Sequence, residues 1–186
     1  MKVRIAARRW VLPFSVLAIA AVAGAQSPEI RSLAPYVPSP HKIVERMLEL
    51  AEVKQSDTVY DLGSGDGRIL VTAAQKFGAR AVGIEIDPEL AKKSEARLQE
   101  LALSNRAKVI QANLLEVDLS PASVVTLYLL TSANTMLKPN LEKSLKPGSR
   151  VVSHDFQIDG WTPVKTERVR GEGRTHTIYL YEIGKQ

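Results

Sequence analysis

The chain of 186 residues contains no cysteine and only three histidines. Without thiols it forms no disulfide bonds and no cysteine-ligated zinc site, and it has no thiolate nucleophile. His41, His154 and His176 lie far apart in the sequence and do not form a ligand pair on one helical turn. The sequence therefore predicts no metal site.

Acidic side chains are absent from the N-terminal end, since no Asp or Glu precedes Glu29. Most of the net charge of +5 comes from four basic residues in the first nine positions, Lys2, Arg4, Arg8 and Arg9. The rest of the chain is nearly neutral and lacks the excess of positive charge that binding to a phosphate backbone requires. We therefore expect no nucleic acid as a partner.

Polar residues are almost missing from residues 10–25, which follow the basic residues 1–9 and end in Ala23-Gly24-Ala25. This pattern is typical of a signal peptide, and an uncleaved segment would act as a membrane anchor. The apolar run is shorter than the ~20 residues that span a bilayer, which favours cleavage. We expect the protein to be exported, to the periplasm or the extracellular space, or to be membrane-anchored, with membrane contact through residues 1–25.

The remaining sequence is long enough for one domain and too short for two. Residues 26–39 are rich in proline and predict a linker or an ordered arm, and residues 40–186 form the predicted domain. Ser39 and Pro40 are expected to be the N-cap and first residue of a helix that ends near Val53.

Hydrophobic periodicity then predicts alternating strands and helices. The expected strands are 58–62, 81–86, 107–111, 123–130 and 150–154, and the expected helices are 67–77, 88–103 (capped by Asp87) and 132–145. Two further segments, 164–170 and 175–183, predict an antiparallel hairpin. The fold class is therefore α/β: a Rossmann-like, doubly wound sheet of five β/α repeats, mostly parallel, with the antiparallel C-terminal hairpin at its edge.

The most informative segment is Asp-Leu-Gly-Ser-Gly-Asp-Gly at residues 61–67, between the first strand and the next helix. Ligands of open α/β sheets bind at such strand ends, and glycines allow a ligand to approach the backbone. Glu85 ends the second strand about 20 residues later, where a carboxylate can accept hydrogen bonds from ribose hydroxyls.

The charge of this turn distinguishes between nucleoside ligands. Asp61 and Asp66 would repel the pyrophosphate of NAD or FAD, and the third glycine is at Gly67 where the dinucleotide motif requires it at the position of Arg68. S-Adenosylmethionine, with adenosine at one end and a cationic sulfonium and ammonium at the other, fits the turn better. We therefore predict S-adenosylmethionine as the cofactor.

From Tyr36 to Tyr181 the sequence resembles the class I methyltransferases, whose first motif matches residues 61–67 and whose second matches Glu85. The segments 36–40, 59–68, 124–130 and 147–154 are similar to those of the small membrane-associated protein-lysine methyltransferases. That family includes the enzymes that modify the ATP synthase c subunit and the adenine nucleotide translocase. The resemblance implies a protein acceptor, for which a membrane protein is one candidate.

The resemblance also implies a set of cofactor contacts. Gly63, Gly65 and Gly67 would wrap the methionine part and Glu85 would hold the ribose. Asn113 takes the place of the family's usual aspartate beside the adenine. The full predicted set of cofactor-binding residues is Tyr36, Asp61, Gly63, Gly65, Gly67, Glu85, Ile86, Asn113 and Leu114. For Tyr36, which would cover the cofactor from the arm, simple packing is the alternative.

Candidates for catalysis follow the fourth and fifth strands. Asn134 would orient the acceptor amine, and His154 and Asp155 are expected to face the same cleft, with His154 as general base or as the partner in a structural hydrogen bond. A small-molecule acceptor and a noncatalytic nucleoside-binding module remain as alternatives. No Asn/Asp-Pro-Pro-Tyr/Phe segment is present, which argues against methylation of nucleic-acid bases.

Overall fold

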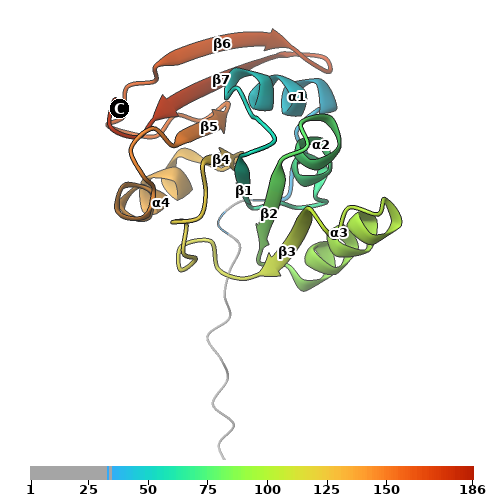
Figure 1. Ribbon diagram of the computed structural model, residues 1–186. Coiled ribbons are helices and arrows are strands. Elements are labelled where there is room, and N and C mark those ends of the chain that lie inside the picture. Colours follow the sequence, from blue (N-terminus) through green and yellow to red (C-terminus); the bar gives the residue numbers. More distant parts are fainter. Residues whose placement is uncertain (1–32, 34) are drawn as a thin grey trace, which may run out of the picture.

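Strands and helices alternate along the chain in the predicted order. The computed structural model describes Leu33 and residues 35–186 (Figure 1). The helices in this part are α1 (His41–Leu50), α2 (Arg68–Lys76), α3 (Pro88–Glu100) and α4 (Thr131–Ser144). The strands are β1 (Thr58–Leu62), β2 (Arg80–Glu85), β3 (Ala107–Gln111), β4 (Val124–Leu127), β5 (Arg150–His154), β6 (Lys165–Arg170) and β7 (Thr175–Glu182).

The seven strands form one sheet in the order β3-β2-β1-β4-β5-β7-β6. Strands β1 to β5 are parallel, β7 is antiparallel to β5, and β6 is antiparallel to β7. The predicted fold class, a mostly parallel sheet with an antiparallel hairpin at its edge, is confirmed. Strand β4 is shorter than the predicted 123–130, and residues 128–130 leave the sheet at the end where ligands of such folds bind.

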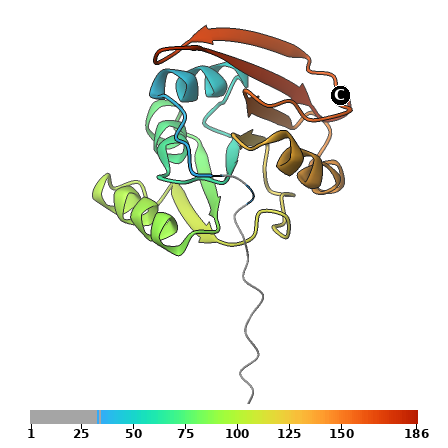
Figure 2. The ribbon, with the colours of Figure 1, turned by 180° about the vertical axis from the view of Figure 1, so that it is seen from behind.

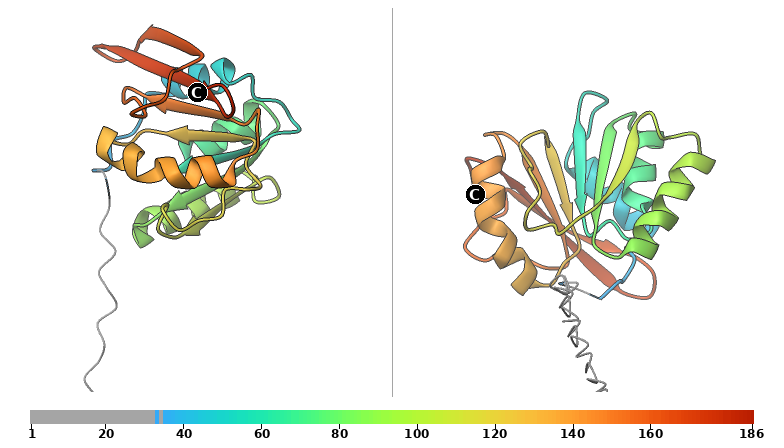
Figure 3. Two further views of the ribbon diagram at one scale, coloured as in Figure 1. Left: turned by 90° about the vertical axis from the view of Figure 1, so that its left-hand side faces the viewer. Right: turned by 90° about the horizontal axis from the view of Figure 1, so that it is seen from below.

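The two faces of the sheet are covered unequally, as the end-on view in Figure 3 and the rear view in Figure 2 show. Helices α1, α2 and α3 pack on one face, where Met47, Leu70 and Leu98 are fully buried. Helix α4 packs on the other through Leu137 and Leu141. Residues 112–123, between β3 and β4, contain no helix, so the prediction of five complete β/α repeats was wrong at this link.

Helix capping was predicted correctly at α3 and incorrectly at α1. The Asp87 carboxylate accepts hydrogen bonds from the backbone amides of Glu89 and Leu90, at 2.8 and 3.1 Å. At α1 the N-cap is Pro40, with no side-chain cap. The Ser39 hydroxyl is instead hydrogen-bonded to Nδ1 of His154 at 2.8 Å, which ties the segment before α1 to the end of β5.

The prediction of export or membrane anchoring is contradicted. The segment on which it rested, residues 1–25, lies outside the described residues. Within Leu33 and residues 35–186, no helix is long and apolar enough to cross a membrane. The longest helix of this part, α4, has 14 residues, which corresponds to ~21 Å against a hydrocarbon core of ~30 Å.

Candidate functional site

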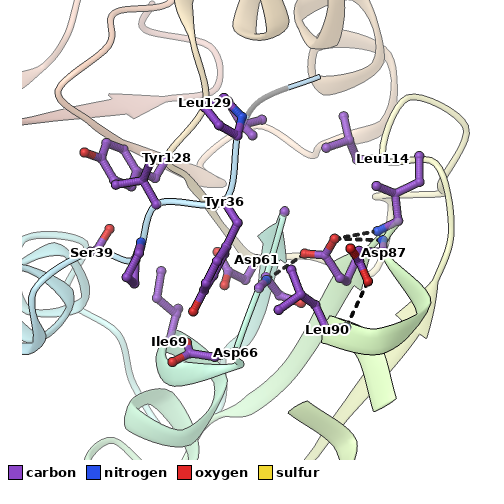
Figure 4. Close-up of a pocket in the computed structure, with 18 of the residues that line it drawn as sticks. Tyr36, Ser39, Asp61, Asp66, Ile69, Asp87, Leu90, Leu114, Tyr128 and Leu129 are labelled. Atoms are coloured by element: carbon purple, nitrogen blue, oxygen red, sulfur yellow. Dashed lines mark hydrogen bonds between the residues drawn. The ribbon is translucent and has the colours of Figure 1, made fainter. Parts of the chain in front are cut away.

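A cavity of about 240 Å³ opens at the C-terminal ends of β1, β2 and β4 (Figure 4). It lies where the strand order reverses direction, between β1 and β4, which is the ligand-binding position of doubly wound sheets. All the predicted cofactor-binding residues except Gly67 line this pocket: Tyr36, Asp61, Gly63, Gly65, Glu85, Ile86, Asn113 and Leu114. The structure therefore brings these residues together around one cavity.

The glycine turn is held against β2 and covered by the N-terminal segment. The backbone amides of Gly63 and Ser64 both donate to the Ile84 carbonyl, at 2.8 and 3.0 Å. Gly65 has a φ of +51°, and a β-carbon there would lie 2.5 Å from Cε2 of Tyr36. Only glycine combines this conformation with so close an approach of the aromatic ring.

Glu85 is buried, and both oxygens of its carboxylate are held by backbone amides. Oε2 accepts from the Gly65 amide at 2.7 Å, and Oε1 accepts from the amides of Ile86 and Asp87 at 2.9 and 3.0 Å. These bonds fix the carboxylate between the glycine turn and the end of β2, and Glu85 lines the pocket there. Each oxygen retains lone pairs that can accept a hydroxyl hydrogen from a ligand.

Gly67 does not line the pocket, although it was predicted to contact the cofactor. It has a φ of +74° and precedes the first residue of α2. A β-carbon on Gly67 would overlap the Ser94 hydroxyl of α3. Gly67 therefore serves the close packing of α2 against α3.

Asp61 lies beneath the glycine turn with a buried carboxyl group. Burial raises the pKa of Asp61 to about 7, although its side chain accepts a hydrogen bond from Thr126 Oγ1 at 2.7 Å. The nearby charges of Glu85 and Asp66 raise this pKa further. A cationic ligand group in the pocket would favour the ionised form of Asp61.

Asp66 differs from Asp61 because its charge is compensated. Arg68 donates to both of its oxygens, at 2.9 and 2.7 Å, and Arg97 lies 3.6 Å away. Burial acts to raise the pKa of Asp66, but the Arg68 guanidinium outweighs burial and the pKa is lowered. Of the two carboxylates predicted to favour a cationic ligand, only Asp61 lacks an ion-pair partner among the described residues.

Arg68 also anchors the residues before α1. Its Nη1 donates to the Ser39 carbonyl at 2.7 Å. In Figure 4 the Tyr36 ring points into the pocket toward Asp66. Burial and the Asp66 charge raise the pKa of Tyr36, so its hydroxyl is neutral at physiological pH. Within the described part of the predicted arm, Tyr36 and Ser39 thus lie over the glycine turn.

Asn113 lines the pocket, but its side chain is engaged locally. Its Oδ1 accepts from the Leu115 amide at 3.1 Å, and its Nδ2 donates to Glu116 at 2.9 Å. The apolar side chain of Leu114 lines the same wall. A planar base would therefore meet Leu114 directly, and Asn113 retains one N–H donor and one lone pair of Oδ1 for a further hydrogen bond.

The three predicted catalytic residues do not line the pocket. Asn134 is fully buried, and its Nδ2 donates to the carbonyls of Phe156 and Gln157 at 3.3 and 3.2 Å, which holds the loop after β5. His154 is fully buried behind Tyr128, and burial lowers the pKa of His154 to about 4. Asp155 accepts hydrogen bonds from Arg174 and from the Thr177 amide. The structure thus gives each a structural contact and none an approach to the pocket.

Tyr128 lines the pocket, although the sequence placed it inside a strand. Strand β4 ends at Leu127, and the Tyr128 ring stacks on the His154 ring with centroids 3.8 Å apart. Its hydroxyl accepts a hydrogen bond from Arg174 at 3.1 Å. The sequence did not show that the strand ends at Leu127, because the next three residues, Tyr128, Leu129 and Leu130, are also hydrophobic.

The pocket as a whole suits a nucleoside with a cationic group at its other end. It has a fixed carboxylate at Glu85, a glycine turn that admits close approach, and a buried, uncompensated carboxyl group at Asp61. The only cationic side chain among its lining residues, Arg68, is paired with Asp66.

Comparisons with known proteins agree with this site. The family model of the ANTKMT methyltransferase domain matches residues 61–165. A protein-lysine N-methyltransferase of Saccharolobus islandicus is 53% identical over 152 residues, which cover 81% of this chain and 94% of the relative. The human lysine N-methyltransferase of the ATP synthase c subunit is 32% identical over 84% of this chain, which spans 65% of the human protein.

Among solved structures, an RNA methyltransferase of Salinibacter ruber in complex with S-adenosyl-L-homocysteine is 49% identical. Its TM-score is 0.75, and the match covers 81% of this chain and 95% of that structure. Its description differs from those of the protein-lysine relatives in the acceptor. The names of the relatives therefore agree on methyl transfer and differ on what is methylated.

Proposed function

The chain belongs to the family of the ANTKMT methyltransferase domain and is an S-adenosylmethionine-dependent methyltransferase, and from this premise we propose that it methylates a lysine side chain of a protein acceptor. The observation that carries the proposal is the 53% identity, over nearly the whole length of the relative, to a protein named for this activity. Family members that act on the ATP synthase c subunit make a membrane protein one candidate acceptor.

Different residues of the pocket would bind different parts of the cofactor. Glu85 would accept hydrogen bonds from the ribose hydroxyls, and Leu114 would contact the adenine. Asp61 would balance the positive charge at the methionine end. The bound cofactor supplies an electrophilic methyl group on a good leaving group. The protein then has to orient the acceptor in line with that methyl group and keep its amine unprotonated.

The other end of the pocket supports an amine acceptor. Tyr128 and Leu129 follow β4, and Leu33 and Val37 line the same cavity from the N-terminal side. A lysine amine that enters these apolar and aromatic surroundings is desolvated, which lowers its pKa toward neutrality. The amine can then lose its proton to water without a dedicated base, which agrees with the absence of His154 from the pocket lining.

Transfer of a labelled methyl group tests the acceptor. Purified enzyme is incubated with tritiated S-adenosylmethionine and, separately, with membrane proteins, soluble proteins, RNA and small metabolites of the source cells. We expect label in protein, recovered as methylated lysine after acid hydrolysis. Label confined to small metabolites would contradict the proposal.

Methylation of RNA is the second candidate, because it is the activity given for the Salinibacter ruber structure. The pocket favours the protein acceptor, since its lining includes the carboxylates Asp61, Asp66, Glu85 and Asp87 but only one cationic side chain. A phosphate backbone at this mouth would be repelled. Label recovered in RNA and absent from protein would establish this alternative.

Substitution of Glu85 tests the cofactor side of the proposal. Glu85→Ala is expected to weaken S-adenosylmethionine binding by about 1.5–3 kcal/mol, or roughly tenfold to 150-fold, because a charged hydrogen-bond acceptor is lost. Isothermal titration calorimetry measures the change. Glu100→Ala, at an exposed position at the end of α3, is the matched control and should leave the affinity unchanged.

A further inference from the structure

Two consecutive residues at the end of β5, His154 and Asp155, meet His176 of the neighbouring strand β7. His154 ends β5, Asp155 follows it, and His176 lies on β7, the antiparallel neighbour of β5. Nε2 of His154 lies 2.8 Å from Nδ1 of His176, and Oδ2 of Asp155 lies 3.2 and 3.4 Å from these two nitrogens. Three potential ligand atoms therefore surround one point.

The backbone at Asp155 explains how consecutive side chains reach the same point. In an extended strand, neighbouring side chains point to opposite faces. Asp155 has a φ of +60°, so the extended conformation ends at His154 and the next carboxylate turns toward the histidine ring. The side-chain contacts of this cluster thus depend on the end of β5 and on its register with β7.

Hydrogen bonds hold the outer atoms of the cluster. Nδ1 of His154 is bonded to the Ser39 hydroxyl at 2.8 Å, and Oδ1 of Asp155 accepts from the Thr177 amide at 2.8 Å. These bonds leave Nε2 of His154 and Oδ2 of Asp155 directed toward Nδ1 of His176. Such outer contacts are typical of metal ligands, whose orientation is set by the partners of their second nitrogen or oxygen.

We propose that His154, Asp155 and His176 bind a divalent transition-metal ion of the zinc class. Ligand atoms at ~2.0–2.1 Å from zinc in tetrahedral geometry lie about 3.3–3.4 Å apart. Oδ2 of Asp155 lies at 3.2 and 3.4 Å from the two ring nitrogens, and these nitrogens, 2.8 Å apart, would separate by about 0.5 Å around the ion. Two imidazoles and one carboxylate leave at least one coordination position for water.

Both histidines of the cluster are shielded from solvent. His154 is fully buried and His176 nearly so. Burial excludes bulk water from Nε2 of His154 and Nδ1 of His176, which lie within hydrogen-bonding distance of each other and would both face a bound ion.

Arg174 occupies the outer side of the cluster. Its Nη2 lies 2.6 Å from Oδ2 of Asp155, and its side chain is about half exposed. The guanidinium therefore neutralises the oxygen that a metal would bind, and it competes with the metal for this atom. Its exposure allows Arg174 to turn toward solvent when the metal binds.

The site is separate from the cofactor pocket but is connected to it. None of the three ligands lines the pocket, whereas Ser39 and Tyr128 do, and both contact His154. A bound metal would fix the His154 ring, and through it the positions of Ser39 and Tyr128. The role of the metal ion is thus structural, and metal binding does not depend on which acceptor is methylated.

Titration of untagged, chelator-treated full-length protein with Zn²⁺ tests the proposal. We expect one site per chain with a micromolar or lower dissociation constant, and a loss of ~100-fold or more in both His176→Asn and Asp155→Asn. His41→Asn removes an exposed histidine outside the cluster and should bind Zn²⁺ as the unaltered protein does. Failure of both cluster variants to weaken binding would show an adventitious ion only and overturn the proposal, as would the lack of stoichiometric binding.

If His176→Asn and Asp155→Asn do not fold, a variant of the half-exposed Arg174 still tests the proposal. Arg174→Gln removes the competing guanidinium without changing a ligand, so it is expected to bind Zn²⁺ at least several-fold more tightly. Unchanged or weaker binding by this variant would contradict the proposal. Co²⁺ should give visible d–d absorption in the unaltered protein and in Arg174→Gln, and its absence from both would also contradict the proposal.

Discussion

At the scale of single residues, Asp61 is the group in the pocket whose charge depends most on what is bound. Its carboxyl group is buried and accepts one hydrogen bond, from Thr126. Burial raises the pKa of Asp61 to about 7, above its unfolded value, so the folded protein holds a proton that the unfolded chain releases. The contribution of Asp61 to folding stability is therefore lost as the pH rises from about 4 to 7.

A cationic cofactor should favour the ionised form of Asp61 over the protonated form. Because binding requires ionised Asp61, we expect the affinity for S-adenosylmethionine to increase by roughly tenfold from about pH 6 to about pH 7.5, as the pKa of about 7 implies. Calorimetry in buffers of different ionisation enthalpy should detect release of a proton at the lower of these pH values. In Asp61→Asn both effects should be absent, and a pH dependence that persists in this variant would contradict the role of Asp61.

The sequence identified residues in local motifs better than residues whose contacts depend on distant segments. Glu85 and Gly65 were found because the motif and the strand end are continuous in the chain. His154 was correctly placed at the end of the fifth strand but expected to face the cleft. The fold places it behind Tyr128, and its partners Ser39 and His176 lie 115 and 22 residues away.

At the scale of elements, the packing of α2 against α3 depends on Gly67 and Ser94. The Ser94 hydroxyl is buried without a hydrogen-bond partner among the described residues, and it occupies the space where a side chain on Gly67 would lie. Gly67→Ala is expected to lower the free energy of unfolding by about 3 kcal/mol, through backbone strain and steric overlap. Urea denaturation measures this loss.

A double variant separates the two causes. Ser94→Ala removes an unpaired buried hydroxyl and is expected to stabilise the protein by roughly 1 kcal/mol. The double variant Gly67→Ala/Ser94→Ala should be more stable by at least ~1 kcal/mol than the sum of the two single effects predicts. Gly148→Ala is the matched control, because Gly148 has a φ of +84° with open space around it and should show only the backbone strain. Strict additivity would mean that overlap with Ser94 is not the cause.

Most helices and strands could be predicted, because hydrophobic periodicity and the Gly, Pro and Asp residues that begin or end elements are local properties of the sequence. The errors arose where tertiary contacts determine how a residue is used or where an element ends. Ser39 looked like a helix cap, but its hydroxyl binds His154. Strand β4 was predicted to continue to Leu130, but the chain leaves the sheet after Leu127 to form the pocket wall.

At the scale of the whole molecule, a partly buried ion pair connects the start of β5 to the segment before β1. Arg150, at the start of β5, is paired with Asp57, which precedes β1, and also donates to the carbonyls of Ala51 and Glu52 after α1. Burial acts to raise the pKa of Asp57, but hydrogen bonds from Lys54, Ser123 and Arg150 outweigh it and lower the pKa.

Breaking this pair should destabilise the entire domain. Arg150→Met is expected to reduce the free energy of unfolding by about 3 kcal/mol at neutral pH, because it leaves a buried carboxylate unpaired. The lowered pKa of Asp57 means that its stabilisation is present above about pH 4 and is lost as the pH falls through the folded-state value. The difference from the unaltered protein should therefore shrink below about pH 4. Arg80→Met, at an exposed arginine, is the control.

The central claim is that the turn after β1 and the carboxylate that ends β2 hold S-adenosylmethionine. A crystal structure of the protein with S-adenosyl-L-homocysteine tests it most directly. We predict that both ribose hydroxyls lie within hydrogen-bonding distance of the Glu85 carboxylate, that the adenine contacts Leu114, and that the sulfur lies on the side of Asp61 and Tyr128. A ligand bound elsewhere, or a ribose that does not contact Glu85, would contradict the claim.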